Sequence, residues 1–278
     1  MKKSEFDWMS KDGLKIYAQG WEPDFGLEAV VCLVHGIGEH SSRYSHVANY
    51  LVNKGYAVLA FDLRGHGRSE GQRGHTRTYD ALMDDIACFL DKVQDRFPRS
   101  LRFLYGHSLG GNLVINYALR SKPLLAGVIA TAPELRLAFE PPPVKVALGR
   151  IMNTIYPAFS QASGLDTRTL SRDVSVIQAY ENDPLVHDRV SARLFIGFYE
   201  AGLWAIAHAE EFQLPLLLMH GSADRLTSVD ASREFAAKAG RTCTLKIWDG
   251  CYHEIHNDLD KDEVFKFLVN WLDQQKRN

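Results

Sequence analysis

Short, mostly apolar runs alternate with amphipathic stretches over most of this chain. Apolar runs of this length are typical of strands that are buried on both faces of a sheet. Residues 6–21 predict a β-hairpin that turns at Asp12-Gly13. The remaining strands are expected at residues 29–34, 57–61, 101–105, 127–132, 214–220 and 243–248.

The segments between these runs predict helices. In residues 78–97 the apolar side chains recur at helical spacing, and the acidic ones lie mostly on the other side. Strands that alternate with helices predict a mostly parallel sheet with helices on both faces, which is an α/β fold. The other helices of this fold are expected at residues 42–54, 112–121, 230–239 and 262–274.

The alternation of strands and helices stops after Pro133 and resumes at residue 214. Residues 134–211 contain helical segments and loops but no convincing strand, and a mostly apolar helix is expected over residues 144–155. We therefore predict an α/β core formed by residues 1–133 and 212–278. Residues 134–211 are predicted to form a helical cap over the end of the sheet.

Residues 106–110, with the sequence GHSLG, match the motif G-x-S-x-G between an expected strand and an expected helix. In that setting a sharp turn forces Ser108 into a strained backbone conformation and lifts its hydroxyl clear of the sheet. Neighbouring backbone then passes so close to Gly106 and Gly110 that larger side chains would clash. Ser108 is therefore the candidate nucleophile.

A serine hydroxyl needs a base and a group that orients the base, and both should follow strands at the carboxyl edge of the sheet. Asp224 follows one strand and His253 follows the last one. The chain order Ser108, Asp224, His253 is that of the α/β-hydrolase fold. Asp249 is an alternative orienting group, and His256 is an alternative base.

Backbone N–H groups should stabilise the oxyanion that forms when a serine attacks a carbonyl. The N–H of Leu109, at the start of the helix after Ser108, is the first candidate. The second is the N–H of Ile37, because the loop at residues 35–40 contains two glycines that let backbone approach a substrate closely.

Composition narrows the class of protein. The formal net charge is −2 and no block is rich in Lys or Arg, so a nucleic-acid partner is not expected. No apolar segment follows the N-terminal lysines, and no run reaches the ~18 apolar residues of a spanning helix. The 4 cysteines show no close pairing motif, which favours reduced thiols and a cytoplasmic protein.

A collinear set of segments consists of HGIGEHSSRY at residues 35–44, FDLRGHGRS at 61–69, GHSLGG at 106–111, residues 170–186, GSADRL at 221–226 and Tyr252-His253. This set spans nearly the whole chain and resembles monoacylglycerol lipases and the lysophospholipase-like serine hydrolases around them. The resemblance implies a capped α/β-hydrolase that cleaves carboxylic esters of lipids through an acyl-enzyme on Ser108, without a metal or organic cofactor. The implied substrate is a monoacylglycerol, which yields glycerol and a free fatty acid.

The resemblance also implies that Glu39, Arg43 and His256 hold the glycerol head group. From the residues alone, Glu39 and Arg43 are four apart and equally suit an ion pair at a helix start, and His256 suits a solvated loop. Lysophospholipase and broad-specificity carboxylesterase activity stay open as alternatives. An alternative of another class is a ligand-binding α/β-hydrolase that serves as a receptor or scaffold.

The expected cap helix at residues 144–155 is apolar nearly all round, so it must be buried or must meet something apolar. It is expected to line an acyl tunnel, to pack on the core, or to contact a membrane or lipid aggregate peripherally. Cys251, two residues before His253, is either a thiol accessible near the site or a small apolar filler.

Overall fold

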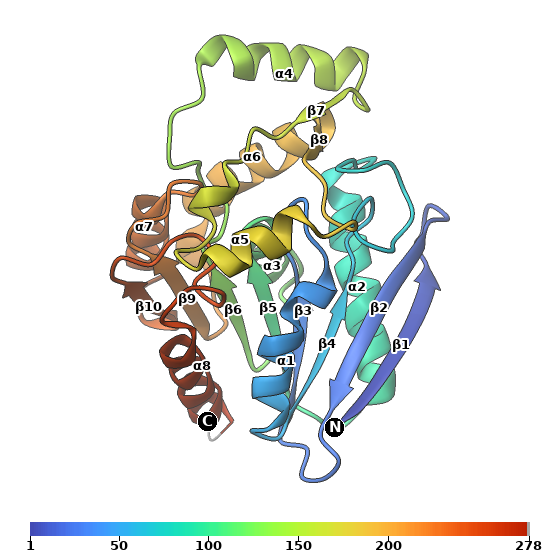
Figure 1. Cartoon of the computed structure of the whole chain (residues 1–278), viewed down its shortest axis with the longest axis vertical. Coiled ribbons are helices and arrows are strands. Elements are labelled where there is room, and N and C mark those ends of the chain that lie inside the picture. Colours follow the sequence, from blue (N-terminus) through green and yellow to red (C-terminus); the bar gives the residue numbers. More distant parts are fainter. Residues whose placement is uncertain (277–278) are drawn as a thin grey trace.

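Residues 1–276, which the computed structural model describes, fold around an eight-stranded sheet with the order β1-β2-β4-β3-β5-β6-β9-β10 (Figure 1). The strands from β4 across to β10 run parallel, whereas β1 and β2 form an antiparallel hairpin at one edge. The strands are β1 Lys2–Met9, β2 Lys15–Glu22, β3 Ala29–Val34, β4 Tyr56–Phe61, β5 Arg102–His107, β6 Gly127–Thr131, β9 Leu216–Gly221 and β10 Cys243–Trp248.

Helices cover both faces of this sheet. The helices α2, α3 and α7 pack on one face, and α1 and α8 pack on the other. The α-helices are α1 Ser45–Val52, α2 Tyr79–Arg96, α3 Leu109–Ser121, α4 Pro143–Ile155, α5 Val174–Glu181, α6 Ala192–Ala207, α7 Val229–Ala239 and α8 Lys261–Gln275. The short 3-10 helices are η1 Ser41–Tyr44, η2 Thr167–Thr169, η3 Ala209–Glu211 and η4 Gly240–Thr242.

Strand β3 shows why an uninterrupted apolar run suits the centre of the sheet. Val30, Cys32 and Val34 belong to the core cluster under α2 and α3, whereas Val31 and Leu33 belong to the cluster under α1 and α8. Because successive side chains of a strand point to opposite faces, both sets must be apolar.

The predicted α/β architecture, a mostly parallel sheet with helices on both faces, is confirmed, and several element boundaries agree closely with the prediction. The strands expected at residues 29–34 and 243–248 are β3 and β10. Helix α2 begins after Thr78, whose hydroxyl caps it by accepting a hydrogen bond from the Ala81 N–H at 3.1 Å. The helix expected at residues 42–54 differs, because it begins as the 3-10 turn η1 and its α-helical part is only α1.

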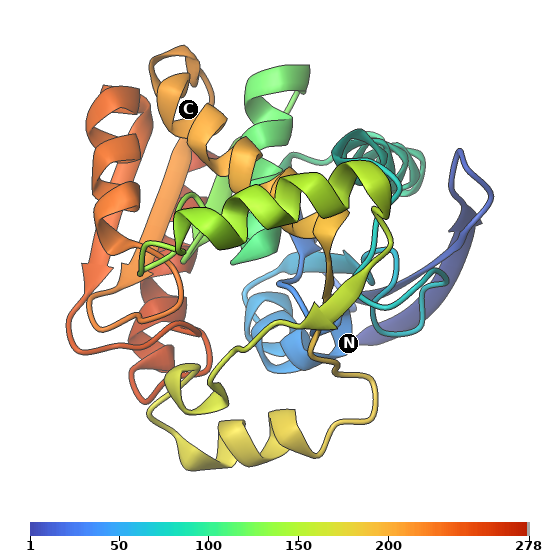
Figure 2. The ribbon, with the colours of Figure 1, turned by 90° about the horizontal axis from the view of Figure 1, so that it is seen from above.

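The segment between β6 and β9 forms the upper part of the molecule in Figure 1. Figure 2 shows α4 lying across the top, above α6, which in turn packs on α3. The expectation of no strand here was wrong, because β7 Ser160–Ala162 and β8 Arg189–Ser191 form a two-stranded antiparallel sheet. Since β6 and β9 are hydrogen-bonded neighbours, the segment leaves and re-enters the sheet at adjacent strands. Among residues 1–276, no helix is both long and apolar enough to cross a membrane.

Candidate active site

Ser108 lies at the sharp turn between β5 and α3, with a φ of 53° and a ψ of −117°. Few residues other than glycine adopt this conformation, so the backbone here is strained. A Cβ at Gly106 would lie 2.2 Å from the Gly110 carbonyl oxygen, and one at Gly110 would lie 2.1 Å from that of Val34. The crowding expected around this serine is therefore present.

Asp224 and His253 meet at the carboxyl edge of the sheet, from the loops after β9 and β10. The Nδ1 atom of His253 lies 2.7 Å from Oδ2 of Asp224, and both side chains are buried. Burial alone would lower the pKa of His253, but the charge and hydrogen bond of Asp224 raise it above its ordinary value. The imidazole is thus oriented and made a stronger base by one carboxylate.

The carboxylate of Asp224 is itself held by several donors. Its Oδ1 accepts from the N–H groups of Leu226 at 2.7 Å and Thr227 at 3.1 Å. Its Oδ2 lies 2.9 Å from Nε2 of His220 and accepts from the Thr227 hydroxyl at 2.8 Å. Burial opposes ionisation of this carboxyl, yet His253 and His220 hold its pKa well below the usual range.

His220 and Thr227 were not identified from the sequence as members of this site. The signal available was their position, since His220 is the penultimate residue of β9 and Thr227 lies three residues after Asp224. Only the fold shows that both side chains turn back onto the same carboxylate oxygen.

The two alternative residues lie elsewhere. Asp249 accepts a hydrogen bond from the Ser222 hydroxyl at 3.1 Å on the exposed side of the loop. His256 is buried, stacks on Tyr44 with ring centroids 4.9 Å apart, and has no hydrogen-bond partner for either ring nitrogen among the described residues. The structure therefore pairs Asp224 with His253 rather than with His256.

The loop after β3 passes beside Ser108. A Cβ on Gly36 would lie 3.2 Å from the Ser108 Cβ, so the loop backbone runs close to the serine. The N–H groups of Ile37 and Leu109 find no protein acceptor among residues 1–276. Ile37 and Ser108 also border the same cavities, which leaves the Ile37 backbone beside the space that a substrate would occupy.

Glu39, Arg43 and Glu254 form a buried ion network behind this loop. Glu39 Oε1 accepts from the Gly36 N–H and the Tyr44 hydroxyl, each at 2.7 Å, and its Oε2 accepts from Arg43 at 2.6 Å. Arg43 also donates two hydrogen bonds of 2.8 Å to Glu254. The ion pair that stood as the alternative role for Glu39 and Arg43 is therefore present, and Glu254 is a third member that the sequence did not reveal.

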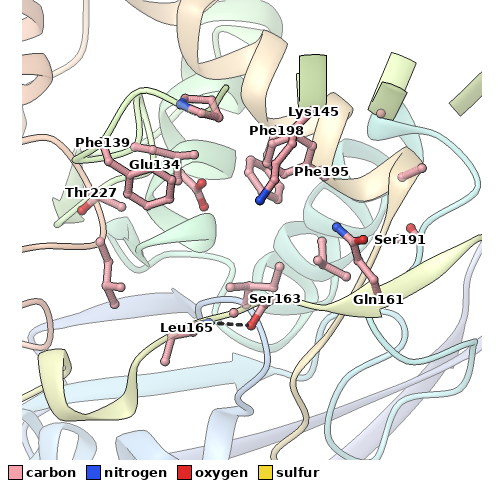
Figure 3. Close-up of a pocket in the computed structure, with 18 of the residues that line it drawn as sticks. Glu134, Phe139, Lys145, Gln161, Ser163, Leu165, Ser191, Phe195, Phe198 and Thr227 are labelled. Carbon is pink, nitrogen blue, oxygen red and sulfur yellow. Dashed lines mark hydrogen bonds between the residues drawn. The ribbon is translucent and has the colours of Figure 1, made fainter. Parts of the chain in front are cut away.

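A cavity of about 470 Å³ opens beside Ser108 and His253, and residues of α4 form part of its wall. Figure 3 shows this cavity with its labelled lining residues. Most of its wall is apolar. Besides Ser108 and His253, its polar side chains are those of Glu134, Lys145, Gln161, Ser163, Ser191 and Thr227. The apolar part comes largely from the segment between β6 and β9 and includes Leu137, Phe139, Leu148, Met152, Phe195 and Phe198.

A second, much smaller cavity of about 10 Å³ also touches Ser108, Ile37 and His253. Its wall is more polar and includes Glu39 and Tyr180. Arg43 and His256 are not among the residues that line either cavity. Of the three residues that the resemblance assigns to the head group, Glu39 is thus the one that borders open space.

Cys251 is fully buried, with its Sγ near Arg172 and Asp260. Burial raises the pKa of its thiol to about 12, so the thiol stays protonated at neutral pH. This environment favours the apolar-filler interpretation of Cys251.

A serine at a strained strand-to-helix turn, with an Asp–His pair at the same edge of a mostly parallel sheet, is characteristic of α/β-hydrolases, and the chain has that fold. More particularly, it belongs to the family described as serine aminopeptidase, S33, whose family model matches residues 27–260.

Similar proteins place the chain more closely within that fold. An uncharacterized abhydrolase domain-containing protein of Dictyostelium discoideum is 33% identical over 281 residues, covering 100% of this chain and 30% of that protein. The monoacylglycerol lipase of Mycolicibacterium smegmatis is 32% identical over 272 residues, covering 97% of each chain. The crystal structure of Paleococcus ferrophilus monoacylglycerol lipase matches 99% of this chain and 100% of its own, with 33% identity and a TM-score of 0.83. The resemblance to monoacylglycerol lipases is therefore confirmed.

Proposed function

We propose that this chain is a serine hydrolase of lipid carboxylic esters and that its preferred substrate is a monoacylglycerol. The observation that carries the proposal is the Asp224–His253 pair, 2.7 Å apart, beside the same cavities as the strained Ser108. The monoacylglycerol lipases among its relatives support the choice of substrate.

In the proposed reaction, Ser108 attacks the ester carbonyl while Nε2 of His253 takes the proton from its hydroxyl. Nδ1 of His253 faces Asp224, so the carboxylate orients the ring and stabilises the imidazolium that forms. The imidazolium then protonates the departing glycerol oxygen. A water molecule, deprotonated by His253, attacks the acyl-enzyme, and the fatty acid leaves as Ser108 regains its proton.

The negative charge on the carbonyl oxygen requires donors in both steps. We assign this role to the N–H groups of Ile37 and Leu109, which have no protein acceptor among the described residues. Donors fixed in the backbone need no reorganisation when the charge develops, and losing one typically costs about 10²–10³-fold in turnover.

The two cavities suggest where the acyl chain and the glycerol of the substrate bind. The acyl chain would occupy the larger apolar cavity, with the ester carbon at Ser108, and the glycerol would lie on the side of the smaller polar one. The smaller cavity has room for only about one water molecule, so it must widen when glycerol binds. Glu39 would then contact glycerol directly. Arg43 would act by positioning Glu39, and His256 by packing on Tyr44 behind it.

The test is hydrolysis of 1-monooleoylglycerol by the purified chain, with release of oleic acid as the readout. Lysophosphatidylcholine and p-nitrophenyl esters serve as competing substrates. We expect a higher kcat/KM for the monoacylglycerol and loss of turnover in Ser108→Ala with an unchanged folded structure. Ser100→Ala, a serine outside the site, is the matched control.

Three results would contradict the proposal. A preference for lysophosphatidylcholine would change the substrate to a lysophospholipid, and equal turnover of every ester would indicate a broad-specificity carboxylesterase. Binding of monoacylglycerol without any hydrolysis by the unmodified chain would favour a receptor or scaffold.

Helix α4 supports a further part of the proposal, that residues 134–211 act as a cap which contacts lipid aggregates. Val144, Ile151 and Ile155 are 77%, 52% and 75% exposed, respectively. The same helix lines the larger cavity through Leu148 and Met152, and Ser108 borders that cavity too. A lipid that leaves an aggregate at α4 would therefore enter next to the cavity that leads to Ser108. Apolar side chains on an exposed helix favour insertion at a lipid surface.

Sedimentation with phosphatidylcholine vesicles that contain monooleoylglycerol tests this contact. Replacing Val144, Ile151 and Ile155 together by serine should reduce the bound fraction. Phe25→Ser/Leu124→Ser removes two apolar side chains elsewhere that are even more exposed, at 92% and 90%, and should leave the bound fraction unchanged. Equal losses in both variants would refute a specific role for α4.

A further inference from the structure

The larger cavity contains a carboxyl group that the proposed reaction does not use. Glu134 is only 7% exposed, and Figure 3 shows its carboxylate pointing into the cavity. Among residues 1–276, no hydrogen bond or ion pair reaches that carboxylate, although Lys145 lines the same cavity. The carboxylate faces a cavity large enough to hold water, so a ligand that displaces this water without offering a hydrogen bond would leave a polar group unpaired, which is costly.

The position of Glu134 is set by its backbone. Its N–H donates to the carbonyl oxygen of Ser108 at 3.0 Å, and its own carbonyl accepts from Nδ2 of Asn112 at 2.7 Å. The same carbonyl would lie 2.9 Å from a Cβ on Gly202 of α6. Because the backbone is held between the serine turn and α6, the side chain stays directed toward the space beside Ser108.

The protonation state of this group suits a hydroxyl partner. Burial raises the pKa of the Glu134 carboxyl to about 7, and the nearby His253 opposes part of that rise. Near neutral pH the carboxyl can therefore donate a hydrogen bond when protonated or accept one when ionised. A hydroxyl can serve as the partner in both states, whereas a carbonyl oxygen can only accept.

We propose that Glu134 is a specificity-determining residue that binds a hydroxyl group carried by the acyl chain within the first few carbons from the ester. The proposal rests on the proposed function, because it requires ester hydrolysis at Ser108 with the acyl chain in the larger cavity. Glu134 lines that cavity and not the smaller one that borders Glu39. Its hydrogen bond to the Ser108 backbone keeps it near the carbonyl end of the chain. The preferred substrates are thus hydroxyacyl esters.

The experiment compares kcat/KM for 1-(3-hydroxydecanoyl)glycerol and 1-decanoylglycerol, which differ only by the hydroxyl. The unmodified chain should favour the hydroxyacyl ester by about tenfold or more, since a plain chain leaves the carboxyl unpaired. Glu134→Leu should remove or reverse this preference and improve turnover of the plain ester. Glu134→Gln should keep most of it, because the amide both donates and accepts. Glu140→Leu removes an exposed carboxylate in the same segment and should change nothing.

A second pair of substrates separates the two possible sources of a hydroxyl. Ethyl 3-hydroxydecanoate and ethyl decanoate lack glycerol, so the preference should persist with them if Glu134 contacts the acyl chain. A preference that vanishes with the ethyl esters would assign Glu134 to the glycerol and overturn the acyl assignment.

The outcomes distinguish this inference from the proposed function. If the unmodified chain hydrolyses both glycerol esters with equal kcat/KM, or if Glu134→Leu leaves the ratio unchanged, the role of Glu134 is refuted while ester hydrolysis stands. If neither ester is hydrolysed, both fail together. The ratio in the unmodified chain decides the question even if Glu134→Leu does not fold.

Discussion

The guanidinium of Arg43 forms a bidentate ion pair with the carboxylate of Glu254 through two hydrogen bonds of 2.8 Å, although the residues lie 211 positions apart in the sequence. This pair joins the loop that carries Ile37 to the loop that carries His253. Burial favours the neutral acid, yet Arg43 holds the pKa of Glu254 far below its usual range. The relative placement of the proposed base and the proposed oxyanion donor therefore depends on a buried charge.

Arg43→Met should destabilise the chain by about 3–5 kcal/mol at pH 7, because it leaves buried carboxylates without their cation. The pH dependence should also change sign. In the unmodified chain the depressed pKa of Glu254 stabilises the fold above about pH 4.5, and this contribution is lost as the pH falls. In the variant, protonating Glu254 relieves an unpaired charge, so stability should rise as the pH falls from 7 toward 4.5.

Urea unfolding at several pH values measures both effects. Arg168→Met, which removes an exposed Arg–Asp pair, should leave stability unchanged. Equal midpoints for Arg43→Met and the unmodified chain at pH 7 would show that the network does not stabilise the fold.

Asp224→Asn should lower kcat by about 10⁴-fold, since the amide no longer stabilises the imidazolium or selects the correct tautomer. Turnover needs neutral His253, so activity falls as the pH drops through the pKa of that ring. Asp224 raises that pKa, so its removal should move the acid limb of the kcat/KM profile to lower pH. Asp249→Asn, at the neighbouring strand end, is the control, and an acid limb that moves upward would argue against the assignment.

Ser108→Gly should abolish turnover and stabilise the chain by about 1 kcal/mol. A serine at φ 53° is strained by about 1–3 kcal/mol, and glycine removes that strain while losing about 0.5–1 kcal/mol of entropy. Ser108→Ala should abolish turnover without this gain, because alanine keeps the Cβ. Differential scanning calorimetry compares the variants, and identical midpoints would show that the turn stores no strain.

Gly110→Ala should destabilise the chain by about 3 kcal/mol or more, because the new Cβ would meet the Val34 carbonyl oxygen at 2.1 Å. The Cβ is fixed to the helix backbone and the oxygen belongs to the strand backbone, so neither atom can rotate away and β3 must separate from α3. The matched control is Gly197→Ala in α6, whose Cβ would meet Tyr79 at an ordinary 3.5 Å. That variant should gain about 0.5–1 kcal/mol from helix propensity, as urea unfolding would show.

The elements that the sequence predicts best are those whose pattern and burial agree. Strand β3 is apolar at every position because both of its faces are buried, and α2 has a cap at Thr78 and a regular apolar stripe. Strands β7 and β8 were missed because each has three residues and neither carries a strong alternation. Ser160–Ala162 is mostly polar, and its pairing with Arg189–Ser191 depends on tertiary contacts.

The candidate site likewise contains some residues that the sequence predicts and others that it does not. Ser108, Asp224 and His253 are recognisable because motifs and strand ends restrict where they can lie. The partnership of Arg43 with Glu254 and the burial of Glu134 depend on which loops meet in space, and no local pattern encodes either. The same limit applies to His220. A histidine four residues before an aspartate is not a recognised motif, so the sequence does not indicate that the two side chains meet.

The neighbouring positions of β6 and β9 have a consequence for how such a chain can diversify. The segment between them begins and ends at two hydrogen-bonded strands, so its length and sequence can change without shifting the sheet register. Most of the apolar wall of the larger cavity comes from this insertion, while Ser108, Asp224 and His253 come from outside it. Grafting a different insertion between the same two strands is therefore a route to new ester selectivity that leaves the three proposed catalytic residues unaltered.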